Sequence, residues 1–149
     1  MAKTAPLPAH PSWSILLLLN RLSIGWYMLV AGWGKVQGEL DGVGAFYRSS
    51  GYQERLPGWL PDWLALGHGY ALPWVELIFG GLLLIGLFTR TSALVLFLLS
   101  VSIAIALLGS GDLLPRHHIF LFLTIIPLLA LYGGGRYALD PLVASWRNR

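Results

Sequence analysis

The sequence has no cysteine, and this absence excludes several kinds of chemistry at once. A thiolate nucleophile, a dithiol relay, a Cys-ligated iron–sulfur cluster and a Cys zinc site all require that residue. Charged residues are also scarce, at 11% of the chain, whereas soluble domains have about one quarter. Any redox role of this chain must therefore use a bound cofactor or a partner protein.

Basic runs are lacking as well, which argues against a nucleic-acid partner. The formal net charge is +3 and the pI is near 9.5, but the ten Lys and Arg residues are scattered singly along the chain. Proteins that bind the phosphate backbone gather such residues into a patch or a run. We interpret the excess positive charge as membrane-flanking charge and expect no nucleic-acid partner.

Hydrophobic sequence is what the chain has in abundance: 56% of its residues are hydrophobic, and the mean hydropathy is +0.66. Four stretches with almost no charge approach the ~20 residues that a helix needs to cross a ~30 Å hydrocarbon core. We expect an all-α integral membrane protein, a bundle of four transmembrane helices over residues 13–34, 64–88, 91–109 and 117–134. The membrane domain is expected over residues 13–142, between a tail of residues 1–12 and a basic C-terminal tail of residues 143–149.

The loops predict an orientation in a bacterial-type inner membrane. With four spans both termini share one side, and that side carries five Lys or Arg residues against four on the other. We therefore expect both termini in the cytoplasm. The long connection, residues 35–63, contains several Trp and Tyr residues among Gly and Pro, a composition typical of the headgroup zone. It would form an aromatic extramembrane loop between the first and second helices.

Two charged residues, Arg21 and Glu76, lie inside the predicted spans. Each costs roughly 2.5 to 3.5 kcal/mol at the centre of a spanning helix, so something must offset them. If the first two helices run antiparallel, the two residues lie at comparable depth. We expect them to form an intramembrane ion pair, which could either fix the helix register only or take part in binding or proton handling. Lys35 is expected to close the first helix at the interface.

Histidines supply the remaining chemistry. His68, His117 and His118 begin the second and fourth spans, so they should lie near the outer membrane face, beside Tyr70 and Trp74. Three interpretations are open: hydrogen bonds to the backbone, a quinone-headgroup site with these five residues at its mouth, or metal or haem ligation. Ligation is the least favoured, because adjacent histidines point about 100° apart on a helix. We predict no metal site and assign no catalytic residue.

Glycine patterns predict how the helices pack. Gly25 and Gly32 are seven residues apart and lie on one helix face, where small residues let neighbouring backbones approach closely. The segment 133–140 begins with three glycines and predicts a helix stop followed by a turn, across which Arg136 and Asp140 are placed to pair.

Three of these motifs occur in a fixed order along the chain: Arg21–Gly25 leading to Ala31–Lys35, then Glu76–Arg90, and finally Gly133–Asp140. In this order and spacing they resemble the DoxX family of small four-helix membrane proteins, over residues 15–142. The resemblance implies a four-helix fold and an association with membrane redox systems, such as the small subunits of thiosulfate:quinone oxidoreductase and related quinol oxidase complexes. It does not imply one particular activity.

Taken together, these features predict a membrane subunit or accessory protein of a quinone-linked oxidoreductase system, with a quinone bound near the outer face. The expected partners are the lipid bilayer and a membrane or peripheral redox protein or a second copy of the chain. The alternative is a carrier or assembly factor that binds a small lipid or a client protein and does no redox chemistry. A self-contained enzyme ranks third, because the chain has no redox centre of its own.

Overall fold

The computed structural model of the chain describes residues 11–39, 47–48, 52–107 and 116–140, and this part is helical apart from its turns and connections. The elements are α1 (Pro11–Glu39), the short 3₁₀ helix η1 (Gln53–Arg55), α3 (Asp62–Ile85), α4 (Thr89–Leu107) and α5 (Arg116–Tyr132). The predicted all-α class is confirmed for the described residues. The four long helices begin and end within about five residues of the predicted spans, because each follows an apolar run.

Two of these helices are long and apolar enough to cross a membrane, over Ser12–Gly38 in α1 and Asp62–Ile85 in α3. The apolar stretches of the other two, Thr89–Ile105 and Leu121–Tyr132, are shorter. At 1.5 Å per residue, the 24 residues of α3 extend about 36 Å and the 17 of α5 about 26 Å. By length, then, α1 and α3 are candidate spans, whereas the 17 residues of α5 are at the lower limit for a ~30 Å hydrocarbon core.

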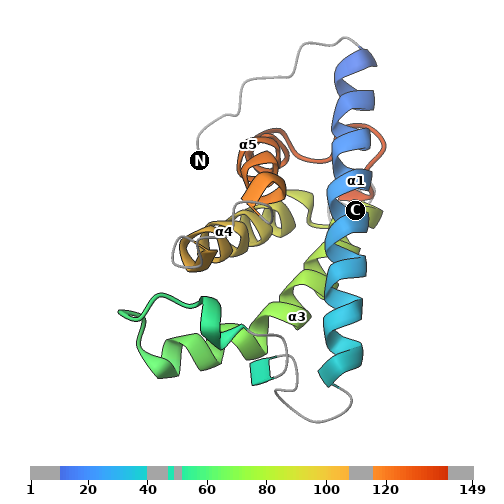
Figure 1. Cartoon of the computed structure of the whole chain (residues 1–149). Coiled ribbons are helices and arrows are strands. Elements are labelled where there is room, and N and C mark those ends of the chain that lie inside the picture. The colour runs from blue at the N-terminus through green and yellow to red at the C-terminus, as the bar shows by residue number, and fades with distance from the viewer. Residues whose placement is uncertain (1–10, 40–46, 49–51, 108–115, 141–149) are drawn as a thin grey trace.

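Figure 1 shows α1 as one unbroken helix along one side of the molecule, with α4 and α5 packed together on the other side. α3 packs mainly against α1 and also contacts α4, so it links the two halves. The direction of α3 changes along its length in Figure 1, and Pro73 lies near its middle. A proline removes one helical hydrogen bond and commonly bends a helix at that point.

Glycines hold α1 against α3. A Cβ atom added to Gly25 would lie 2.7 Å from the backbone nitrogen of Leu84, and one added to Gly32 would lie 2.8 Å from the Cα of Leu77. Real Cβ atoms do not approach backbone so closely, so any side chain here would push the helices apart. Earlier residues of α1 face later residues of α3, which makes the two helices antiparallel. The predicted close approach at Gly25 and Gly32 is confirmed.

The interior of the bundle contains both apolar side chains and buried polar or charged ones. Four residues that are fully or almost fully buried, Leu83, Leu96, Ile126 and Leu129, come from α3, α4 and α5 and form the centre of the core. Among the residues that the structure describes, five polar or charged side chains are also buried: Arg21, Glu76, Thr89, Ser92 and Ser100. Large hydrophobic side chains, in contrast, are exposed along the outside of all four helices.

One end of the bundle is closed by two left-handed glycines. Gly86 ends α3 with φ of 77°, and Gly133 follows α5 with φ of 79°; only glycine adopts such angles without strain. The chain then folds back, and the N–H groups of Leu139 and Asp140 donate to the Gly86 carbonyl (3.0 and 3.1 Å). The helix stop predicted at Gly133 is therefore confirmed, and the segment after it covers the turn between α3 and α4.

Candidate functional site

The two buried charges predicted as partners have different partners in the structure. Lys35 Nζ donates to Glu76 Oε2 and forms an ion pair with it. The Glu76 side chain is 4% exposed and that of Lys35 is 26% exposed. Arg21 is buried too, as expected, but its hydrogen bond goes elsewhere. The predicted Arg21–Glu76 pair is therefore wrong.

The register of α1 against α3 explains the difference. Gly32 lies against the backbone of Glu76, so Lys35, one turn later on α1, reaches the carboxylate. Arg21 precedes Gly32 by eleven residues, about 16 Å along a helix, and lies beside Gly86 at the other end of α3. The antiparallel arrangement on which the predicted pair depended is present, but α1 continues past Lys35 instead of ending there.

Arg21 is only partly satisfied at its end of the bundle. Its Nη2 donates to the backbone carbonyl of Tyr137 (3.1 Å), while Nε and Nη1 have no hydrogen-bond partner. Thr89 Oγ1 and Ser92 Oγ also have no hydrogen-bond partner. In the described part of the chain, these two oxygens and the two Arg21 nitrogens are the buried side-chain N and O atoms that lack a partner. Each unsatisfied group costs about 1 to 3 kcal/mol, and a charged one more. The cost is concentrated where α3 turns into α4.

At the other end of the bundle, a chain of hydrogen bonds runs through His68. Ser102 Oγ donates to the Leu99 carbonyl (2.6 Å), so it accepts from His68 Nε2–H at 2.8 Å. His68 Nδ1 is then the acceptor for the Tyr52 hydroxyl, which bonds to it. The rings of Tyr52 and His68 are stacked, with centroids 5.9 Å apart and an interplanar angle of 13°. This chain fixes the imidazole of His68 in one tautomer.

The three residues of this hydrogen-bonded chain line one side of a cavity of about 250 Å³, which we call the histidine cavity. The surface that faces the cavity is almost entirely apolar, because the polar atoms of the chain are turned toward one another. The cavity is lined by Tyr52, Leu56, Pro57, Trp59, Leu60, Leu64, His68, Ser102 and Ile105. An apolar slot with a few convergent polar groups at one side is the usual form of a small-molecule site.

The other four residues predicted at the mouth of a quinone site either do not line this cavity or have side chains that the structure does not describe. Tyr70 stacks on Tyr47, with centroids 6.0 Å apart, and does not line the histidine cavity. Trp74 is 47% exposed on α3 and does not line it either. His117 and His118 lie in the first turn of α5, but their side chains are outside the described residues. Of the five predicted residues, the structure therefore places one, His68, in a cavity wall.

Two residues of this site were not predicted as site residues. Tyr52 belongs to the aromatic loop, and the apolar environment raises the pKa of its hydroxyl to about 12. Ser102 looks from its sequence like a helical serine that bonds back to its own helix, which it does. Its second contact, with a histidine 34 residues earlier in the chain, depends on how α3 packs against α4. No local sequence signal reports that contact.

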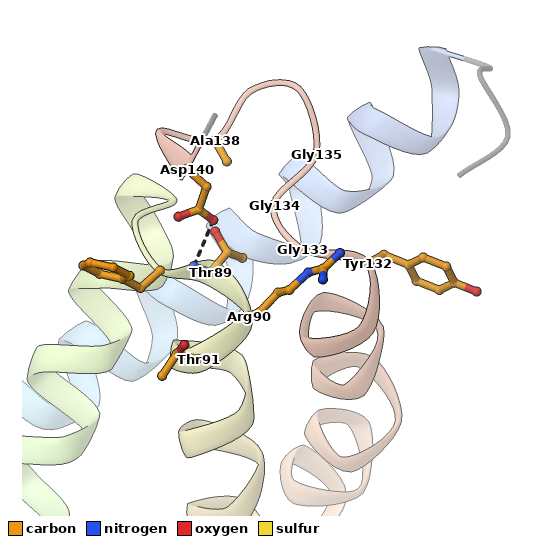
Figure 2. Close-up of a pocket in the computed structure, with 10 residues that line it drawn as sticks. Thr89, Arg90, Thr91, Tyr132, Gly133, Gly134, Gly135, Ala138 and Asp140 are labelled. Carbon is orange, nitrogen blue, oxygen red and sulfur yellow. Dashed lines mark hydrogen bonds between the residues drawn. The ribbon is translucent and has the colours of Figure 1, made fainter. Parts of the chain in front are cut away.

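A second cavity lies at the Arg21 end, and Figure 2 shows its lining. This glycine cavity has a volume of about 390 Å³ and is lined by Phe88, Thr89, Arg90, Thr91, Tyr132, Gly133, Gly134, Gly135, Ala138 and Asp140. The loop of the three glycines arches over the start of α4, and Arg90 reaches toward Gly133 (Figure 2). Asp140 Oδ2 accepts from the backbone N–H of Thr89 at 3.0 Å. Asp140 thus caps the start of α4. The sequence had instead predicted that Asp140 pairs with Arg136.

Metal binding finds no support in the residues that the structure describes. Among residues 11–39, 47–48, 52–107 and 116–140, no three His, Asp or Glu side chains gather closely enough to hold an ion. The chemistry available at the histidine cavity is that of hydroxyl and imidazole groups. Such groups can bind and orient a small polar headgroup and exchange protons with it.

The comparison with protein families covers the part of the chain that carries the histidine cavity. The model of the DoxX family matches residues 16–109, which is more than half of the chain. The match takes in almost all of α1, together with α3 and α4, and it ends before α5 and the segment 133–140. No curated protein and no solved structure matches. On the family match, the chain belongs to the DoxX family.

Proposed function

We propose that this protein is a four-span membrane subunit of a quinone-linked oxidoreductase system, and that the histidine cavity binds a quinone headgroup. The proposal rests on the family, on the cavity, and on the burial pattern, in which large hydrophobic side chains are exposed and two charged side chains are buried. It takes α4 and α5 as spans in addition to α1 and α3. It also keeps the orientation suggested by the loop charges, with both termini in the cytoplasm of an inner membrane.

The exposed surface favours a lipid environment. Trp26 is 61% exposed, Leu19 and Trp33 are each 54% exposed, and all three lie on α1. Buried Arg21 and Glu76 lie on the inner faces of the same helix pair. In water, so many exposed large apolar side chains would cause association. In a bilayer, the same surface faces hydrocarbon and the charges are turned inward, as membrane proteins require.

The histidine cavity fits a quinone head by its shape and chemistry. Quinone carbonyl oxygens accept hydrogen bonds, and Tyr52 and His68 both line the cavity. Each donor of the chain is already used within it, so on binding the Tyr52 hydroxyl would turn from His68 Nδ1 to a quinone oxygen. Trp59 and the leucines on the remaining wall suit an apolar ring. The single observation that carries the proposal is this hydrogen-bonded Tyr52–His68–Ser102 chain beside an apolar slot.

Titration of a short-chain quinone into the purified, monodisperse protein tests the proposal. His68→Ala should weaken binding by about tenfold, or 1.4 kcal/mol, because it removes a ring that lines the cavity and the hydrogen-bond partner that positions Tyr52. Trp74→Ala is the matched control, since Trp74 lies on the same helix, is 47% exposed and does not line the cavity; its affinity should stay within about twofold. Absence of binding to folded wild-type protein would end the quinone proposal.

The carrier or assembly-factor hypothesis uses the same cavity and makes a different prediction. An apolar slot also accommodates an acyl chain, so a carrier would retain a lipid or a client protein through purification and would not bind quinone. Mass spectrometry of lipids and proteins that co-purify with the chain separates the two. Retained quinone, or a co-purifying redox subunit, supports the oxidoreductase subunit.

A further inference from the structure

The Arg21 end of the bundle holds polar groups that the protein leaves without partners, and they lie beside an open cavity. Thr89 lines the glycine cavity, its side chain is fully buried, and its hydroxyl has no hydrogen-bond partner. Arg21 is 3% exposed, and two of its three guanidinium nitrogens have no partner. We propose that the glycine cavity binds an oxyanion of the phosphate type, either as a free anion or as the phosphate of a lipid headgroup.

The two unsatisfied groups converge on Gly134. A Cβ atom added to Gly134 would lie 2.6 Å from the Ala138 Cβ, 2.8 Å from Thr89 Oγ1 and 3.3 Å from Arg21 Nη1, so both polar groups pack closely against the Gly134 backbone. Thr89 and Gly134 line the glycine cavity, and Arg21 lies behind them. Gly134 is buried, and any side chain there would clash with Ala138 and Thr89. The bare backbone therefore keeps a hydroxyl and a guanidinium next to the cavity, and both are donors to oxygen.

The charges around the cavity favour a further anion. Arg21 and Arg90 bring two positive charges, and Asp140 brings one negative charge that interacts with Arg21. Asp140 already accepts from the N–H of Thr89, at the start of α4. The next amides of the first turn, those of Arg90 and Thr91, have no acceptor within the helix, and the helix dipole adds partial positive charge there. The Asp140 carboxylate thus uses one of the N–H donors at the start of α4, and the amides of Arg90 and Thr91 remain available to a bound anion.

The rim of the cavity explains why a lipid phosphate is a suitable source. Phe88 is 59% exposed and Tyr132 is 41% exposed, and both line the glycine cavity. Aromatic residues at helix ends are typical of the level of lipid headgroups. A phosphate-type oxyanion offers several oxygens to donors that line the cavity, namely the Thr89 hydroxyl and the Arg90 guanidinium, while buried Arg21 adds positive charge behind Gly134. This inference does not depend on the quinone proposal, because the two cavities lie at opposite ends of the bundle.

The test uses the full chain in detergent and in lipid nanodiscs. The thermal midpoint is measured against sodium phosphate, with sodium chloride at equal ionic strength as the reference, and in phosphatidylcholine discs with and without phosphatidylglycerol. We expect one or both sources to raise the midpoint. Thr89→Val and Arg90→Gln should each raise, by about tenfold, the amount of phosphate or phosphatidylglycerol that gives half of the shift in the thermal midpoint. Arg48→Gln, which removes an exposed arginine in the connection between α1 and α3, should leave it unchanged.

The outcomes separate the two sources. A response to phosphate alone indicates a free anion, and a response to phosphatidylglycerol alone indicates a lipid phosphate. Loss of the response in every variant that folds supports the site. No response to either probe, or a response that both variants retain, would overturn the proposal. Arg90 is exposed, so Arg90→Gln keeps the test valid even if Thr89→Val does not fold. Quinone titration of the same variants should be unaffected, which keeps the two proposals independent.

Discussion

Both ends of the helix bundle contain buried or half-buried polar side chains, but the two ends differ in how completely these side chains are hydrogen-bonded. Toward the end of α1, Glu76 is paired with Lys35, and His68 bonds to both Tyr52 and Ser102. Near the start of α1, Arg21 has one hydrogen bond, while Thr89 and Ser92 have no side-chain partner. A satisfied network is stable without a ligand, whereas an unsatisfied one carries a cost that a ligand can remove. The difference predicts which substitutions will matter at each end.

The largest effect is expected from breaking the Lys35–Glu76 pair. Lys35→Met should lower the free energy of unfolding by about 3 kcal/mol, because it leaves the buried Glu76 carboxylate without compensation. Glu76→Gln should also be destabilising, and the double variant should lose less than the sum of the two. Thermal or denaturant unfolding in detergent measures the cycle.

The control for this cycle is Arg21→Met combined with Glu76→Gln. Arg21 lies beside Gly86 at the end of α3, whereas Glu76 lies about three helical turns earlier in α3 and is paired with Lys35, so their effects should be additive. A coupling energy as large as that of the Lys35 cycle would mean that Arg21 interacts with Glu76 after all.

A smaller loss is expected from the glycine that positions this pair. Gly32→Ala should cost about 1 to 3 kcal/mol, because its Cβ would meet the backbone of α3 at Leu77 and Glu76. Gly34→Ala is the matched control on the same helix, since nothing lies within 4 Å of its Cβ position. That change should stabilise the helix by about 0.5 to 1 kcal/mol. Equal effects of the two substitutions would show that α1 and α3 are not in close contact.

A prediction of about 1 kcal/mol concerns the hydrogen-bonded chain. Tyr52→Phe removes the hydroxyl that bonds to His68 and should cost about 1 kcal/mol at neutral pH. The pKa of Tyr52 is raised from 10.0 to about 12, so the folded state keeps the proton longer than the unfolded state. Stability should then fall as the pH rises from 10 toward 12. The fall should be shallower in Tyr52→Phe, and an identical slope in both proteins would contradict the buried hydroxyl.

The sequence predicted the helices better than it predicted the site. The apolar runs located α1, α3, α4 and α5 to within a few residues, and Gly25 and Gly32 correctly indicated close packing. These features are local, because a run of apolar residues or a glycine face is visible within one helix. The burial of Arg21 and Glu76 followed in the same way from their positions within apolar runs.

What failed depended on register between helices. The partner of Glu76 was assigned from distances to the ends of apolar runs, and Lys35 was taken as an interface residue although α1 continues through it. An error of two or three helical turns in such an estimate is enough to change the partner of a buried charge. In the same way, the contact of Ser102 with His68 depends on the packing of α4 against α3. Such contacts are set by tertiary packing, which the pattern of one chain segment does not contain.

The smallest effect is expected from Arg21→Met in buffer without phosphate or anionic lipid. Arg21 is buried with a single hydrogen bond, to the Tyr137 carbonyl, and an apolar side chain of similar length removes a desolvated charge at little loss. The free energy of unfolding should change by less than about 1 kcal/mol, well below the cost of Lys35→Met. Addition of phosphate or phosphatidylglycerol should then stabilise wild-type protein but not the variant, because the guanidinium beside Gly134 is gone. A cost equal to that of Lys35→Met without any added anion would show that Arg21 is already fully compensated, through Tyr137 and Asp140, and that the two ends of the bundle do not differ.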